Sequence, residues 1–166
     1  MICQQNAILT KDNLSKRNRR GDMGCCFCPA QETLLHLFFD CPIARYIWSL
    51  VAHVVGAVCR PNSFEQFWFW TNTYLSNHKH FHSVGLAAIC WAIWRARNLS
   101  CFEQKIIKSP TEIVCMASSF ICYWSGLQKT EDRAEIEAGA EVLKEAALSF
   151  HPREASSRNA GLLLLH

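Results

Sequence analysis

Three cysteines and one histidine lie close together near the start of the chain. The sequence reads CCFC over residues 25–28, then seven residues, His36, four residues and Cys41. Structural zinc sites use four sulfur or nitrogen ligands at tetrahedral angles, and a CxxC pair can approach one ion from a tight turn. His36 and Cys41 can approach from a short helix and the loop that ends it. The pattern predicts one structural Zn²⁺ ion, with no open position for a substrate water.

Two cysteines compete for the first ligand position. We prefer Cys25, because two residues between it and Cys28 form the usual turn, whereas Cys26 leaves only one and is then the spare cysteine. The alternative interpretation is a redox pair of Cys25 and Cys28 with His36 in the core. Such a motif is expected beside a βαβ pattern, and the sequence shows none.

The segments after this cluster have helical patterns. Apolar residues recur at three- and four-residue spacing from Ile43, and Ser63 with Gln66 forms a capping-box pattern. Residues 84–94 are apolar on every side, which predicts a central helix, and Ser109 followed by Pro110 predicts another helix start. The predicted helices cover residues 43–58, 64–75, 83 to about 104, 110 to about 126, and 131–150.

The predicted fold is mainly α, with a small Cys3His zinc knuckle followed by a four- to five-helix bundle. The chain has 166 residues, which suits one domain. Residues 1–42 form the basic segment and the knuckle, 43–150 the helical region packed with it, and 151–166 a disordered tail. Residues 77–82 are a predicted polar turn, in which His78, His80 and His82 belong to an exposed loop rather than to a second metal site.

Positive charge is concentrated just before the cysteines. The formal net charge is only +3, but residues 11–20 hold one acid and five bases. These bases are the candidate nucleic-acid-binding residues: Lys11, Lys16, Arg17, Arg19 and Arg20. A rigid knuckle could direct them at phosphates, while the alternatives are a solvated linker or a nuclear-localisation signal.

The composition favours an intracellular protein, nuclear or cytoplasmic rather than secreted. Ten cysteines in 166 residues stay below the share of roughly 8–10% that marks a disulfide scaffold, and the start does not resemble an export signal. The longest apolar stretches fall short of the ~20 residues of a membrane helix.

Phe27 and Phe38 are expected to fill the core of the knuckle rather than stack on bases. The tryptophans of the helices are also predicted to pack in the core, as are five cysteines: Cys59, Cys90, Cys101, Cys115 and Cys122.

The first fifty residues resemble a known family. The sequence TKDNL at 10–14, the cysteines, Glu32-Thr33 and HLFFDCP at 36–42, followed by Trp48, are similar to the zinc-binding domain at the C-terminal end of plant LINE-type retrotransposon reverse transcriptases. The resemblance covers residues 8 to about 50, and residues 87–98 and 109–112 are similar to what often follows this domain. It implies Cys25, Cys28, His36 and Cys41 as zinc ligands and nucleic acid, element RNA or its DNA target, as partner.

The sequence does not contain the polymerase of that family. Its four aspartates lie scattered at 12, 22, 40 and 132, so no adjacent pair exists. There is also no nucleophile elbow or phosphate loop. We therefore expect no enzyme, but a zinc-binding and nucleic-acid-binding module, a detached tail of a longer ancestor. The alternative is a vestigial helical domain that binds a protein partner and no nucleic acid.

Overall fold

The computed structural model describes residues 8–17, 21–75, 79–107 and 109–163, with the backbone alone for 79–83 and 151–163. Among these residues there are helices and no strand, apart from an isolated antiparallel bridge between Gly24 and Gln31. The mainly α fold class is therefore confirmed. The helices are α1 (Lys11–Lys16), the π-helix η2 (His36–Asp40), α2 (Pro42–Val54), α3 (Phe64–Tyr74), α4 (Lys79–Phe102), α5 (Pro110–Ser125) and α6 (Thr130–Leu163).

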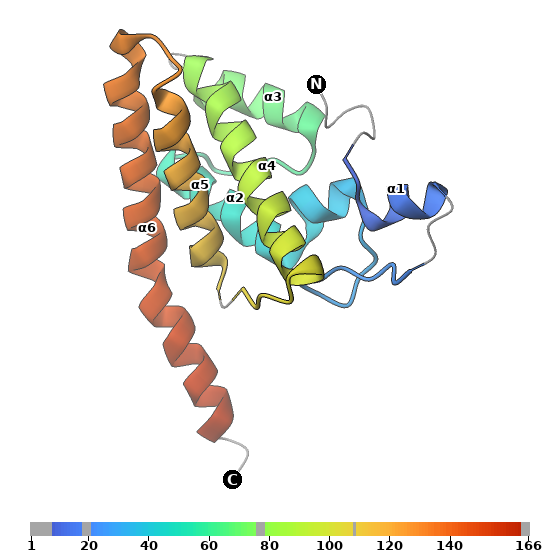
Figure 1. Cartoon of the computed structure of the whole chain (residues 1–166). Coiled ribbons are helices and arrows are strands. Elements are labelled where there is room, and N and C mark those ends of the chain that lie inside the picture. The colour runs from blue at the N-terminus through green and yellow to red at the C-terminus, as the bar shows by residue number, and fades with distance from the viewer. Residues whose placement is uncertain (1–7, 18–20, 76–78, 108, 164–166) are drawn as a thin grey trace.

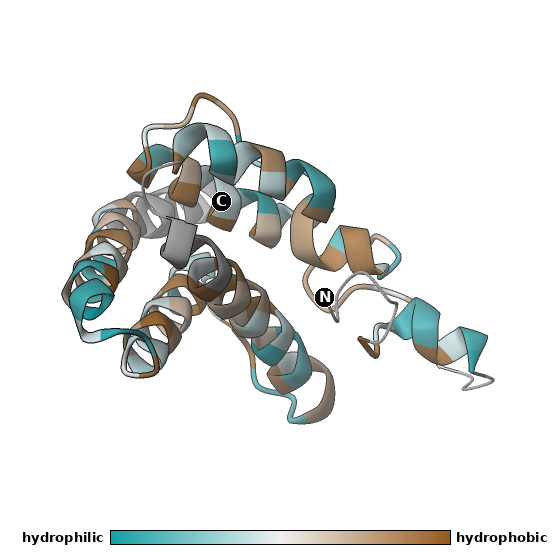
Figure 2. Ribbon diagram, turned by 90° about the horizontal axis from the view of Figure 1, so that it is seen from above, coloured by the Kyte–Doolittle hydropathy of each residue, from teal (hydrophilic) through white to brown (hydrophobic). Residues whose placement is uncertain are grey.

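Helices α4, α5 and α6 lie side by side, with α2 packed against α5, α6 and η2 (Figure 1). Their shared core contains large side chains that are at most 1% exposed, among them Trp48, Ile93, Ile113 and Ile136. Apolar and polar residues alternate along the helices, while α1 lies at one edge and is mostly hydrophilic (Figure 2). The bundle thus places its apolar stripes inward and leaves α1 at the periphery.

Helix α4 occupies the predicted central position, because it contacts η2, α3 and α5. Ala88, Ala92 and Ile93 are fully buried, whereas Trp91 is 44% exposed. The expectation that every helical tryptophan lies in the core is therefore wrong for Trp91. Its ring lies against Trp94, with 5.1 Å between the centroids, at the edge of the bundle.

The two predicted helix starts differ in their caps. At α3 the Ser63 hydroxyl accepts a hydrogen bond from the Gln66 backbone N–H at 3.1 Å, as a capping box requires. At α5 Pro110 occupies the first turn, but Ser109 makes no side-chain cap, and its buried hydroxyl has no partner among the described residues. The start of α5 is therefore confirmed, although the Ser109 side chain does not cap the helix.

The ends of three helices differ from the predicted ranges. Helix α2 ends at Val54, just before Gly56, which has a positive φ of 69°. Helix α4 begins at Lys79, within the predicted polar turn, because residues 79–82 contain neither glycine nor proline and polarity alone does not interrupt a helix. Helix α6 continues beyond residue 150 to Leu163. The division into segments 1–42, 43–150 and 151–166 stays a prediction.

Candidate metal centre

A short hairpin-like loop holds the two cysteines of the CxxC pair. The Cys25 N–H donates to the Ala30 carbonyl at 2.8 Å, and the Glu32 N–H donates to the Met23 carbonyl at 2.9 Å. Inside the loop, the Phe27 N–H points to the Cys25 sulfur at 3.4 Å. The backbone therefore closes the turn and directs both cysteine side chains to the same side.

The other two side chains come from the π-helix η2 and its end. The Thr33 hydroxyl accepts a hydrogen bond from the His36 N–H at 3.1 Å, which caps the turn that carries His36. The Cys41 N–H then donates to the His36 carbonyl at 2.7 Å, the five-residue spacing of a π-turn. Trp48 fixes this turn from α2, because its indole Nε1–H donates to the Phe38 carbonyl at 2.7 Å.

These elements bring the four predicted ligands together. The Sγ atoms of Cys25 and Cys41 lie 4.0 Å apart, Cys28 Sγ lies 3.2 Å from His36 Nε2, and all four ligand atoms lie within 4.8 Å of one another. With Zn–S bonds of about 2.3 Å, tetrahedral angles place two sulfurs about 3.8 Å apart. The observed spacing fits three sulfurs and one nitrogen around one zinc ion.

The electrostatics of the cluster favour a thiolate. The pKa of Cys25 is lowered to about 5, mainly because the Cys41 thiol donates to its sulfur, and in smaller part through the Phe27 N–H and His36. The same hydrogen bond, together with burial, raises the pKa of Cys41. Thiolate is the form of cysteine that binds zinc, so a lowered pKa at Cys25 suits a zinc ligand.

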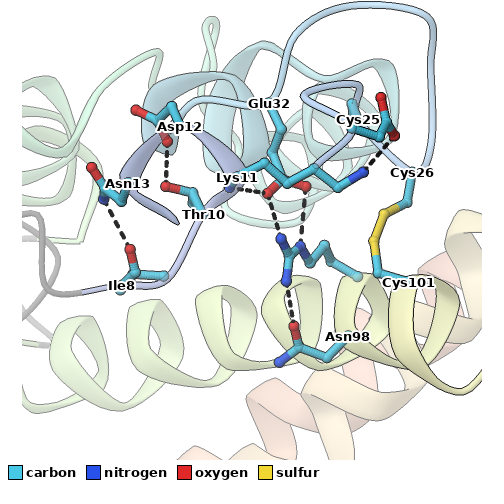
Figure 3. A network of polar contacts seen from close by, with 12 residues as sticks. Ile8, Thr10, Lys11, Asp12, Asn13, Cys25, Cys26, Glu32, Asn98 and Cys101 are labelled. Atoms are coloured by element: carbon cyan, nitrogen blue, oxygen red, sulfur yellow. Dashed lines mark hydrogen bonds and ion pairs between the residues drawn. A yellow bond between two sulfur atoms is a disulfide. The ribbon is translucent and has the colours of Figure 1, made fainter. Parts of the chain in front are cut away.

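Cys26 is not part of this group, because it forms a disulfide with Cys101 at the end of α4, 75 residues away (Figure 3). The geometry therefore agrees with Cys25 as the first ligand. Cys26 and Cys101 also lie near Glu32, but these sulfurs are bonded to each other and the carboxylate of Glu32 is engaged elsewhere. A disulfide here differs from the expectation of a spare Cys26 and of a simple hydrophobic role for Cys101.

A buried ion pair attaches the knuckle to the bundle. Arg97 Nη2 lies 2.7 Å from Glu32 Oε1, and Arg97 Nε lies 3.0 Å from Oε2, with the two side chains 2% and 0% exposed. The Lys11 backbone N–H also donates to Glu32 Oε1 at 2.8 Å (Figure 3). Sequence reasoning placed Arg97 on an amphipathic face of its helix. Locally, Glu32 accepts from the Lys11 N–H and Thr33 caps the next turn, but this short sequence does not indicate Arg97 as the partner of Glu32.

The candidate nucleic-acid-binding bases have different environments. The Lys11 ammonium donates to Asp22 at 2.9 Å and to the Gly24 carbonyl at 2.6 Å, so it is held against the knuckle. The Lys16 side chain is 67% exposed, and its Nζ atom lies 3.4 Å from Asp12 Oδ2. Arg17 is also exposed. Arg19 and Arg20 lie outside the described residues, as do His78 and the side chains of His80 and His82.

The aromatic residues of the knuckle pack as predicted. Phe38 is fully buried, and Phe27 is partly buried against the core.

The predicted burial of the remaining cysteines holds only for Cys90, since Cys59 and Cys122 are exposed and Cys115 is intermediate. Cys25 and Cys28 are both free rather than bonded to each other.

A family model described as zinc-binding in reverse transcriptase matches residues 1–48. The matched segment contains the whole cluster and ends inside α2, within the region of the resemblance. No curated protein and no solved structure matches the chain. The match and the geometry of the four side chains together support zinc binding.

In the part of the chain that the structure describes, no helix has both the length and the apolar character needed to cross a membrane.

Proposed function

We propose that the chain is a zinc-stabilised nucleic-acid-binding module derived from the C-terminal part of a plant LINE-type retrotransposon reverse transcriptase, without polymerase activity of its own. The single observation that carries the proposal is the Cys3His cluster within 4.8 Å, inside the segment that matches the zinc-binding family. Cys25, Cys28, His36 and Cys41 would hold the ion, whose role is to organise a loop with little core of its own.

The nucleic-acid partner is supported by the charge that leads into the knuckle. Lys16 and Arg17 are exposed at the end of α1, and Arg19 and Arg20 follow in the sequence. Contacts with and beside the knuckle restrain this helix, because Glu32 accepts a hydrogen bond from the Lys11 N–H, and Asp22, just before the knuckle, binds the Lys11 ammonium. Bases that stand on a restrained element can neutralise phosphates and release counterions.

The absence of polymerase activity is supported by the scattered aspartates. Polymerases use carboxylates that hold two metal ions close together, and this sequence has no adjacent aspartate pair.

The test of nucleic-acid binding is the salt dependence of binding to a single-stranded RNA. In the zinc-loaded chain, the triple variant Arg17→Ala, Arg19→Ala and Arg20→Ala is expected to reduce the slope of log K against log salt by about 2, since each lost phosphate contact removes about 0.7 for single strands. The matched control removes three bases from α6 and its start: Lys129→Ala, Arg133→Ala and Lys144→Ala.

The control has the same net charge as the basic-segment variant and should keep the wild-type slope. Equal slopes for both variants would contradict an interface at the basic segment. No RNA or DNA binding by the wild type would favour the alternative of a helical protein-interaction domain, for which Phe69, Tyr123 and Leu127, each 74–76% exposed, are the first residues to examine.

A further inference from the structure

The disulfide between the knuckle and α4 begins inside the CxxC turn. Cys26 directly follows the candidate ligand Cys25 and lies two residues before Cys28. Its partner, Cys101, is in the last turn of α4, and the two Cα atoms are 6.2 Å apart. This separation falls within the usual range for a disulfide, about 4.4–6.8 Å, so the bond can close or open without a large movement of the backbone.

The end of α4 is a firm attachment point for this turn. Ala96, Arg97 and Leu99 are at most 7% exposed, so this part of the helix is held by the core. Glu32, at the end of the loop, is attached to Arg97, one helical turn before Cys101 (Figure 3). The disulfide therefore gives the loop 23–32 a second link to the same helix.

The two halves of the candidate ligand set are held in different ways. His36 and Cys41 belong to η2 and its end, and η2 packs against α2 and α4. Cys25 and Cys28 lie in the loop, where the backbone hydrogen bonds around the turn join parts of the loop to each other and not to α4. The disulfide thus fixes the first pair of ligands relative to the helix on which the second pair is packed.

Both sulfurs of the disulfide belong to residues that are only partly buried, Cys26 and Cys101. A small thiol or a small disulfide compound can therefore reach them from solvent. Exposed disulfides are the ones that such compounds most readily reduce and form again.

We propose that Cys26 and Cys101 form a reversible redox clamp on the zinc site. The closed disulfide holds Cys25 and Cys28 in position for the ion and slows its release, and reduction of the pair speeds the release. The proposal rests on the zinc binding proposed above. It follows from preorganisation, since ligands that are held in place lose less conformational freedom when they bind the ion.

The oxidant that closes the clamp is a low-molecular-weight disulfide, such as oxidised glutathione. The sulfur of one cysteine attacks it, so that a mixed disulfide forms and one glutathione thiol leaves. The sulfur of the other cysteine then displaces the second glutathione thiol, and the Cys26–Cys101 bond closes. Two electrons and two protons pass from the pair to oxidised glutathione, which becomes two glutathione thiols.

The experiment compares zinc release from the zinc-loaded full chain in its two redox forms. The pair is closed with oxidised glutathione or opened with a phosphine reductant, and alkylation read by mass spectrometry identifies the form. The transfer of zinc to an excess of a chromogenic chelator is followed by absorbance. The closed form should release zinc roughly tenfold more slowly, the lower end of the effect of groups that orient metal ligands.

Two variants distinguish the clamp from competition for the ion, because a reduced Cys26 thiol could replace Cys25 as a ligand. Cys26→Ser and Cys101→Ser should both release zinc at the rate of the reduced wild type, whichever reagent is present. The control Cys59→Ser, at an exposed free cysteine, should keep the full difference between the two forms. Slow release from Cys26→Ser, together with fast release from Cys101→Ser, would overturn the clamp in favour of competition.

Hydrogen exchange of the zinc-loaded chain gives a second readout. Opening the disulfide should accelerate exchange in residues 23–32 and leave the interior of α4 protected. Equal release rates from the two forms, with zinc bound in both, would overturn the clamp and leave the proposed zinc binding intact. Loss of zinc when oxidised glutathione is added would also overturn it. A chain that binds no zinc in either form would overturn the clamp together with the zinc proposal.

Discussion

Different interactions stabilise the knuckle, residues 23–41, and the bundle formed by α2 to α6. In the bundle, large apolar side chains such as Ile93, Ile113 and Val114 are almost fully buried against one another. The loop of the knuckle, residues 23–32, has only partly buried or exposed apolar residues, whereas Leu37, Phe38 and Phe39 of η2 belong to the core of the bundle. The shape of the loop depends on the four candidate metal ligands, the Glu32–Arg97 pair and one disulfide. A loop too small to bury a core needs such specific links, whereas a helix bundle needs mainly the right apolar spacing.

Removal of the metal should produce the largest difference between the two regions. Zinc binding contributes roughly 10–16 kcal/mol to the folding of small zinc domains, so chelation should unfold the loop 23–32 and leave α4 and α5 folded. Hydrogen exchange read by mass spectrometry should show fast exchange in residues 23–32 and retained protection in the interior of α4 and α5. Far-UV circular dichroism should change little, since residues 23–32 contain no helix.

If chelation accelerated exchange equally in both regions, or in neither, the metal would not be the specific link of the knuckle. Cys59→Ser serves as a control, because this exposed cysteine belongs neither to the four candidate ligands nor to the disulfide. Its variant should respond to chelation as the wild type does.

Breaking the buried ion pair should have the next largest effect. Arg97→Met leaves the Glu32 carboxylate buried without its partner, which costs about 3–5 kcal/mol in the free energy of unfolding. Urea denaturation measures this loss. The double variant Glu32→Leu and Arg97→Met should recover most of it, because an apolar pair replaces the two charges.

Arg133→Met is the matched control on an exposed pair, since Arg133 and Glu137 are 57% and 39% exposed. It should leave the urea midpoint unchanged. Equal midpoints for Arg97→Met and Arg133→Met would mean that the buried pair does not attach the knuckle to α4.

The disulfide between the knuckle and α4 should contribute somewhat less to the free energy of unfolding than the buried ion pair does. Cys101→Ser removes a cross-link that closes a 75-residue loop, and the free energy of unfolding should fall by about 2–4 kcal/mol under oxidising conditions. A dithiol reductant should bring the wild type to the stability of the variant. Cys122→Ser, at an exposed free cysteine, is the control, and an unchanged wild type after reduction would contradict the cross-link.

The smallest predicted change in stability concerns the starts of two helices in the bundle, α3 and α5. Ser63→Ala removes the hydrogen bond from the Gln66 N–H and should cost about 1 kcal/mol. Ser109→Ala removes a buried hydroxyl that makes no cap, and should cause no loss. Thermal denaturation of the two variants in parallel checks the difference, and equal losses would show that the observed cap geometry does not decide their stability.

These caps also illustrate what the sequence can predict. Helix starts at Ser63 and Pro110 and the buried faces of α2 and α4 depend on neighbouring residues, so local spacing predicts them well. The grouping of Cys25, Cys28, His36 and Cys41 was predictable for the same reason, since they lie within 17 residues and their types are typical of metal sites. The π-turn at His36–Asp40 was not predicted, because its geometry depends on Trp48 and on the bundle beneath it.

The contacts that attach the knuckle to the bundle were missed for a different reason. Arg97 meets a carboxylate 65 residues earlier in the chain, and Cys26 meets a sulfur 75 residues later. No local pattern shows such partners, because they depend on where α4 ends in space. Residues 79–82 were misjudged as part of a polar turn because Lys79, His80 and His82 are hydrophilic, although the segment contains no helix breaker.

The central claim is that Cys25, Cys28, His36 and Cys41 hold one zinc ion. X-ray absorption at the zinc edge, combined with elemental analysis of the purified chain, tests it most directly. The account predicts one zinc per chain with three sulfurs at about 2.3 Å and one nitrogen at about 2.0–2.1 Å, lost in Cys25→Ser and kept in Cys26→Ser. A chain without zinc, or zinc that survives Cys25→Ser and disappears in Cys26→Ser, would contradict it.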